Sequence, residues 1–154
     1  MSQENRVKIG RDNYTTTDGT PHYVEPLACF QTLNSTNPAN IGYSSGVVIL
    51  LNSAAQSYAL LEANAPGNVL KVGQRLTIKT ALGTTTAATI KPTPSTLTTG
   101  ATANVVYSQP GAPLSPTGGI IITGYGSVTL RYLGNNVFNV TDYNLGASST
   151  IAFT

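Results

Sequence analysis

The chain contains one cysteine, one histidine and no tryptophan among 154 residues. A single cysteine, Cys29, excludes an intrachain disulfide and a cysteine-rich metal site. Its neighbours are apolar, which favours a buried small residue, because a reactive thiolate needs a cationic neighbour. The only histidine, His22, has no second histidine or cysteine with which to share a metal ion, so a surface or interface position is expected. With only one histidine and one cysteine, a Ser-His-Asp catalytic site is not expected, and no cofactor motif is recognised.

Charge is also scarce. Charged residues make up 9% of the chain, against about 25% in an ordinary domain. Half of them precede Pro26, and seven follow it: Glu62, Lys71, Arg75, Lys79, Lys91, Arg131 and Asp142. A formal net charge of +2 provides little attraction for nucleic acid, so a nucleic-acid partner is not expected. A surface of Thr, Asn, Ser, Gly and Tyr suits burial against other protein copies better than it suits a lone soluble enzyme.

Long hydrophobic runs are absent. The longest apolar run is Val47 to Leu51, well short of the roughly 18 residues of a membrane span. Residues 1–6 contain no apolar signal-peptide core. No membrane partner is therefore expected. The protein is expected to be made in a cytoplasm.

Closely spaced proline and glycine residues, 9 and 15 in number, divide the chain into short segments. Most segments are rich in Val, Ile, Thr and Tyr, which favour strands. Segment 57–63 is compatible with either a strand or a helical turn. The strands are predicted at 27–33, 46–52, 74–80, 84–91, 103–107, 119–123, 127–133, 136–143 and 150–153.

Two of these segments carry strong local signals. The uninterrupted apolar run Val47 to Leu51 predicts a strand that is buried on both faces. The turn signal Gly134-Asn135-Asn136 predicts a hairpin between the strands on either side of it. Within this hairpin, Asp142 is expected either to cap a turn or to pair with Arg131 across the two strands.

The strand pattern predicts an all-β chain with two parts. Residues 27–154 are expected to form one antiparallel β-sandwich or jelly-roll-like domain. Residues 1–26 are polar and carry charges of both signs, so they are expected to form an extended N-terminal arm that gains order on a partner. A frayed terminus is the equal alternative.

The body of the chain offers little for catalysis. Glu62 and Asp142 are its only carboxylates, and nothing in the sequence places them together as glycoside hydrolysis would require. No catalytic residue, metal ligand or cofactor site is predicted. Lys71, Arg75 and Lys79 recur at four-residue spacing, which on a strand places them on one face. This pattern predicts either solvated charges or a basic stripe for a phosphate or an acidic partner.

Tyrosine is the main aromatic residue, with 8 Tyr against 3 Phe. Tyr125, Tyr132 and Tyr143 lie near the predicted final hairpin. Tyrosine combines a large contact area with a polar tip, so these three are candidates for interface or tip contacts, including a sugar platform. Packing in the core or at its rim is the alternative.

The segment from Leu114 to Tyr143 resembles the closing hairpin of β domains on tailed-phage surface proteins. In those domains a Gly-Ser-Val-Thr-Leu strand, here 126–130, is followed by a tight turn and an aromatic-Val strand, here Phe138 to Val140. The segments 47–63 and 74–78 follow the same order, so the resemblance covers residues 46–143. Phe138 stands where these domains usually have Trp. They occur in capsid decoration (cement) proteins, head fibres and tail fibres, and they are commonly homotrimers.

The resemblance implies a non-enzymatic structural protein of a phage virion. It would act as a decoration protein on the capsid exterior, a homotrimer bound to the major capsid protein. Arg6, Lys8 and Arg11 of the arm would pair with acidic capsid surface, and Val7 and Ile9 would add a short strand to an exposed edge. The alternative is a receptor- or glycan-binding fibre or spike module, and a small enzyme ranks below both.

Overall fold

The computed structural model describes residues 13–15, 21–23, 30–36, 39–43, 46–65, 70–108 and 111–154. Strands and loops, without a helix, make up this described part of the chain, which confirms the all-β prediction. None of the described residues forms a helix that could span a membrane. The strands are β1 (Asn13–Thr15), β2 (Pro21–Tyr23), β3 (Phe30–Asn34), β4 (Val47–Leu51), β5 (Gln56–Ala59), β6 (Arg75–Thr80), β7 (Ala87–Lys91), β8 (Val105–Tyr107), β9 (Ile120–Thr123), β10 (Gly126–Gly134), β11 (Val137–Leu145) and β12 (Thr150–Phe153).

Within the predicted N-terminal arm, β1 and β2 pair with each other as a two-stranded antiparallel sheet. The predicted capsid-contact residues of the arm lie outside the described residues. They are Arg6, Val7, Lys8, Ile9 and Arg11.

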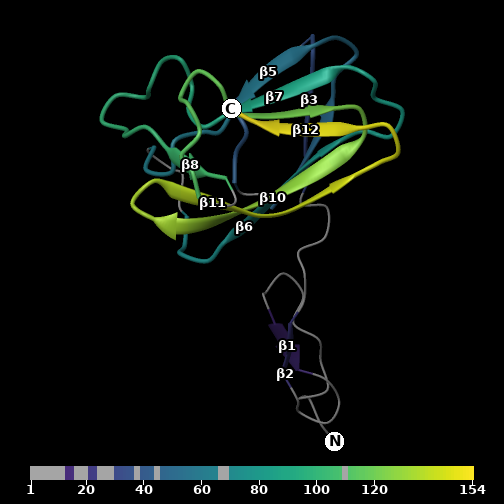
Figure 1. Cartoon of the computed structure of the whole chain (residues 1–154). Helices are drawn as coiled ribbons and strands as arrows, with labels where there is room; N and C mark the ends of the chain where they lie inside the picture. The colour runs from purple at the N-terminus through teal and green to yellow at the C-terminus, as the bar shows by residue number, and fades with distance from the viewer. Residues whose placement is uncertain are drawn as a thin grey trace, which may run out of the picture.

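The other ten strands form two sheets (Figure 1). A six-stranded sheet has the order β3-β4-β6-β10-β11-β8, and a four-stranded sheet has the order β12-β9-β7-β5. From β4 onward the chain alternates between the two sheets, except at β10 and β11, which are consecutive in the six-stranded sheet. Segment 57–63, left open by the sequence, begins within strand β5.

Both sheets are mixed. The pairs β3 with β4, β4 with β6, β8 with β11 and β5 with β7 are parallel, and the other four pairs are antiparallel. The prediction of an antiparallel arrangement is therefore wrong for half of the pairs. Parallel neighbours need a crossover between them. The chain makes such a crossover between β4 and β6 and between β5 and β7, forming one strand in the other sheet before it returns.

Buried side chains from both sheets form one hydrophobic cluster. Along β10, Val128 and Leu130 are fully buried, whereas Thr129 between them is only partly buried. Ile90 and Ile122 of the four-stranded sheet belong to the same cluster and are also buried. Full burial of such a side chain contributes about 1.5–3 kcal/mol. The alternation leaves the opposite side of the six-stranded sheet, called the outer face below, open to solvent.

Strand β4 shows how open this outer face is. Val48 and Leu50 are fully buried, but Leu51 is 44% exposed. The prediction of burial on both faces is wrong, because the crossovers of this chain place a second sheet on one side of β4 and no described layer on the other.

The β10–β11 hairpin is confirmed. Its strands are joined by Asn135 and Asn136, whose φ angles of 52° and 60° match the turn with two positive φ angles that suits a two-residue hairpin loop. Farther along, Thr129 pairs with Asp142 and Leu130 with Val140, so one extra residue forms a bulge in β11. Beyond the bulge, β11 residues exchange faces, which places Asp142 on the outer face.

Candidate functional site

The outer face brings together polar side chains from three neighbouring strands. Ser127 of β10 is opposite Lys79 of β6 on one side and opposite Asn144 of β11 on the other. Lys79 and Asn144 are exposed and Ser127 is partly buried. An ammonium, a hydroxyl and an amide therefore form one row across the sheet.

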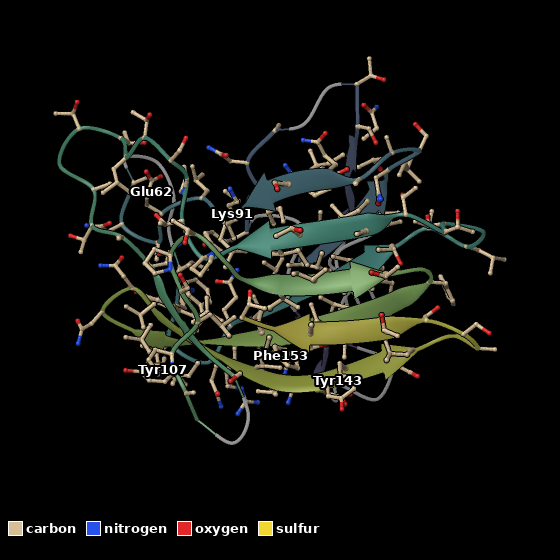
Figure 2. The ribbon with its side chains drawn as sticks, turned by 45° about the horizontal axis from the view of Figure 1, so that its top comes forward. Glu62, Lys91, Tyr107, Tyr143 and Phe153 are labelled. Atoms are coloured by element: carbon tan, nitrogen blue, oxygen red, sulfur yellow. The ribbon has the colours of Figure 1, made fainter. Side chains whose placement is uncertain are left out.

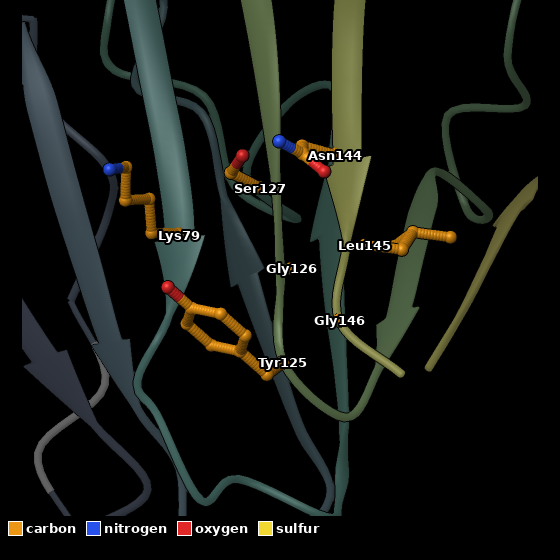
Figure 3. Close-up of a pocket in the computed structure, with 7 residues that line it drawn as sticks. All are labelled: Lys79, Tyr125, Gly126, Ser127, Asn144, Leu145 and Gly146. Atoms are coloured by element: carbon orange, nitrogen blue, oxygen red, sulfur yellow. The ribbon is translucent and has the colours of Figure 1, made fainter. Parts of the chain in front are cut away.

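A shallow pocket of about 160 Å³ lies at this row (Figure 3). Its lining residues are Lys79, Tyr125, Gly126, Ser127, Asn144, Leu145 and Gly146. Tyr125 lies in the bend between β9 and β10, and Gly146 follows the end of β11. The pocket thus combines the polar row with the aromatic ring of Tyr125, a residue that is 42% exposed.

The backbone of Tyr125 is held by hydrogen bonds on both sides. Its N–H donates to Ser149 Oγ at 3.0 Å. Its carbonyl oxygen accepts a hydrogen bond from the Gly146 N–H at 2.8 Å. A side chain presented from a fixed backbone loses little further freedom when it contacts a ligand.

A buried hydroxyl fixes the residues that flank Tyr125. Thr80 is 1% exposed, and its hydroxyl donates to the Gly124 carbonyl at 2.7 Å. The same hydroxyl accepts from the Gly126 N–H at 2.8 Å. Gly124 has a φ of 89°, a conformation that favours glycine. The bend at residues 124–126 therefore has a defined conformation that is held by hydrogen bonds.

Tyr132, the second tyrosine singled out by the sequence, belongs to the core. It is 9% exposed, and its ring packs against Phe138 with 5.1 Å between centroids. Its hydroxyl accepts a hydrogen bond from the Asn136 N–H at 3.3 Å. Of the two positions considered for Tyr132, interface or core, the structure shows the core. Its hydroxyl is not available to a partner, because it is bonded to the hairpin turn.

Tyr143, the third, is 51% exposed. It lies opposite Val128, and its ring makes an edge contact with Phe153 at a centroid distance of 6.0 Å (Figure 2). The two rings line a separate pocket that shares no residue with the one at Tyr125. The structure does not bring the predicted tyrosines together, because the β11 bulge turns Tyr143 away from the outer face.

Arginine side chains form a second feature of the outer face. Arg75 of β6 is directly opposite Arg131 of β10. Thr77, two residues along β6, donates its N–H to Gly46, away from β10. By the alternation of the ladder, Arg75 and Arg131 are then a non-hydrogen-bonded pair, whose side chains lie closest. The Nε of Arg131 is buried and has no hydrogen-bond partner.

The strand register and bounds around this pair correct two predictions made from the sequence. Asp142 lies opposite Thr129, and Asn139 lies opposite Arg131, so the Arg131–Asp142 cross-strand pair is wrong. Lys71 precedes β6 and does not extend the basic stripe along that strand. Arg131 was not predicted to share a face with Arg75 and Lys79, although the alternation along β10, the first strand of the hairpin, places it on the same face as Ser127 and Thr129.

Glu62 has a structural environment. It is fully buried, and its carboxylate accepts hydrogen bonds from the Thr98 N–H at 2.8 Å and the Thr98 hydroxyl at 3.4 Å. Glu62 is thus held by the loop that contains Thr98, whereas Asp142 lies on the outer face of β11, opposite Thr129. Among the described residues, no cluster of His, Cys, Asp and Glu could hold a metal ion.

Asn104 ties the same region together. Its side-chain oxygen accepts from the Ala63 N–H at 3.0 Å, and its amide donates to the carbonyls of Leu61 and Pro92, each at 3.0 Å. The Tyr43 hydroxyl also donates to the Leu61 carbonyl. Burial raises the pKa of Tyr43 well above its usual range, so this hydroxyl keeps its proton.

The side chains of Cys29 and His22 lie outside the described part of the chain. No protein-family model, curated protein or solved structure matches this sequence. The site must therefore be interpreted from its own geometry and chemistry.

Proposed function

We propose that this protein is a non-enzymatic structural protein of a phage virion, a capsid decoration (cement) protein that binds the capsid exterior as a homotrimer. Its partner in this proposal is the major capsid protein. One observation carries the proposal: an arginine pair, Arg75 and Arg131, faces outward from a sheet that otherwise presents mainly uncharged polar and apolar side chains. Like charges at directly opposite positions destabilise a sheet. An acidic partner surface docked there would remove this cost.

The fold of the proposed decoration protein is a β-sandwich of residues 27–154, preceded by an arm of residues 1–26. Burial of side chains from both sheets in one cluster supports the sandwich. The four parallel pairs depart from an antiparallel jelly roll. The arm supplies Arg6, Lys8 and Arg11 as additional cations for the same acidic partner.

Stabilisation of the shell follows from mass action. A protein that binds the assembled shell and not its free subunits shifts the equilibrium toward the shell. Contact through a surface with few charges suits such a role, because burying uncharged hydroxyl and amide groups against partners costs less than burying unpaired charges.

Two measurements test the proposal. Light scattering at several protein concentrations should give the mass of a trimer, and a monomer at every concentration would contradict the homotrimer. Cosedimentation with particles of the phage that encodes the chain should show binding. Deletion of residues 1–18 should abolish this binding and leave the trimer folded, whereas full binding by the truncated protein would remove the arm from the proposal.

A second candidate function is a receptor- or glycan-binding fibre or spike module. The specific observation in its favour is the pocket that combines the exposed ring of Tyr125 with Asn144. Such a module would bind glycan without any capsid, so glycan binding and particle binding separate the two candidates.

A further inference from the structure

The pocket at Tyr125 has the chemistry of a saccharide site. We propose that it binds one carboxylate-bearing sugar unit, a uronic acid of an acidic polysaccharide, with Tyr125, Ser127, Asn144 and Lys79 as its contacts. This inference deepens the second candidate function and is independent of capsid binding.

Tyr125 provides the platform for the sugar ring. One side of its ring lies against the backbone of Gly146, where an added Cβ would come within 2.9 Å of Cδ1. The rest of the ring borders the pocket, and the residue as a whole is 42% exposed. The C–H face of a pyranose packs on such a surface, since tyrosine offers a broad apolar area beside a polar tip.

Ser127 and Asn144 determine the class of ligand. Within the described residues, neither side chain is engaged in a hydrogen bond with another residue. A hydroxyl and an amide can each donate and accept. Sugar hydroxyls also do both, whereas a phosphate presents mainly acceptor oxygens. The polar groups of the pocket therefore match a polyhydroxy ligand better than a phosphate.

Lys79 adds the preference for an acid. It is exposed on the outer face, opposite Ser127 on β10 and Ile49 on β4. Among the described residues, the one carboxylate of this face is that of Asp142, which lies opposite Thr129 and not in the row of Lys79. An ammonium without a carboxylate in its row can form a charge-assisted hydrogen bond to a uronate.

The size of the pocket limits the ligand to a single unit. A volume of about 160 Å³ is below the roughly 300–1,000 Å³ of pockets that enclose drug-sized ligands. One ring would occupy the pocket, and neighbouring units of a polymer would extend over the outer face. Binding of one unit should be weak, with a Kd on the order of 1 mM, and many copies on a particle would raise the avidity.

The test is a titration of the ¹⁵N-labelled full-length protein with trigalacturonate, followed by amide chemical shifts. Its methyl ester, which keeps the hydroxyls and lacks the charges, is the matched ligand. We expect shifts of the Tyr125, Ser127 and Gly146 amides with both ligands, and about tenfold tighter binding of the acid. Absence of shifts at these amides with either ligand would overturn the proposal. Equal binding of inorganic phosphate at the same amides would also overturn it, in favour of a phosphate site.

Variants separate the contributions of the side chains. Tyr125→Ala should abolish binding of both ligands, and Lys79→Gln should reduce binding of the acid to that of the ester. Lys71→Gln and Tyr107→Ala are the controls, because both residues are exposed and lie outside the pocket. Unchanged saccharide binding by a folded Tyr125→Ala protein would refute the saccharide site. The proposal of capsid binding would stand or fall on its own test.

Discussion

Gly146 lies directly against the ring of Tyr125. A Cβ atom at position 146 would be 2.9 Å from Tyr125 Cδ1 and 3.2 Å from its carbonyl oxygen. Contacts this short force a neighbour to move, and here the neighbour is the exposed aromatic ring of the pocket. The absence of a side chain at Gly146 therefore determines where the ring of Tyr125 lies.

The substitution Gly146→Ala should displace this ring and weaken the proposed saccharide binding at least fivefold. The φ of Gly146 does not fall in the left-handed region, so alanine fits the backbone at this position. The change in binding and stability then reports the contact between residue 146 and Tyr125. The stability should fall by about 1–2 kcal/mol, as is usual for an added methyl group in a packed position. Urea unfolding and the trigalacturonate titration measure the two effects.

Gly42→Ala is the matched control. An added Cβ there would meet only Gln31 Oε1, at an ordinary distance of 3.8 Å. Alanine reduces the freedom of the unfolded chain, so Gly42→Ala should be neutral or stabilising by about 0.4–1 kcal/mol. If the two alanine variants show the same change in stability, the contact between residue 146 and Tyr125 does not affect stability.

The sequence predicted the strands more reliably than their arrangement. Turn chemistry at Asn135 and Asn136 and the alternation in β6 and β10 depend on neighbours in sequence, so these elements could be identified. Strand direction depends on which sheet the chain enters next, and the parallel pairing of β4 with β6 carries no local signal. The all-β class was therefore accessible and the mixed sheets were not.

The candidate site shows the same division. Tyr125 could be singled out as an aromatic residue between two glycines. Its partners Lys79 and Asn144 come from strands far apart in sequence, and the bulge in β11 decides which residues reach the outer face. A one-residue shift exchanges the two faces of a strand. For this reason Tyr143, which also looked available, lies against Phe153 instead.

Arg75→Gln should stabilise the isolated protein. Removing one of two like charges at opposite positions on β6 and β10 relieves their repulsion, by about 0.2–1 kcal/mol. Salt screens the interaction between exposed charges, so the gain should shrink between 20 mM and 500 mM NaCl. Urea unfolding at both salt concentrations is the measurement, with Lys71→Gln as a control outside the pair. A loss of stability at low salt would mean that Arg75 has a favourable partner in this chain.

Asn104→Ala should be strongly destabilising, by about 2–4 kcal/mol. The change leaves the Ala63 N–H and the Pro92 carbonyl without their buried partner, and each unsatisfied group costs about 1–3 kcal/mol. Asn64→Ala is the comparison, because Asn64 accepts a similar hydrogen bond from the Thr102 N–H at 2.9 Å in an exposed position. Its cost should stay below about 1 kcal/mol. Equal losses in urea unfolding would show that burial of Asn104 is not the cause.

Tyr43 should make the fold sensitive to alkaline pH. Burial raises the pKa of Tyr43 above the 10.0 of an exposed tyrosine, mainly because the anion would lose its hydration. Below pH 10 the hydroxyl is protonated in both states and the stability is unaffected. Above pH 10 the unfolded chain releases this proton while the folded chain retains it, so the free energy of unfolding falls as pH rises.

The expected slope from one such group approaches about 1.4 kcal/mol per pH unit between pH 10 and the raised pKa. Tyr43→Phe should remove this part of the decline, since Asn104 still donates to the Leu61 and Pro92 carbonyls. Part of the decline should remain, because burial also raises the pKa of Tyr58. Urea unfolding at pH 8, 10 and 11 compares the wild type with Tyr43→Phe and with Tyr125→Phe, an exposed control. A decline of the same steepness in the Tyr43→Phe protein would show that another group is responsible for alkaline unfolding.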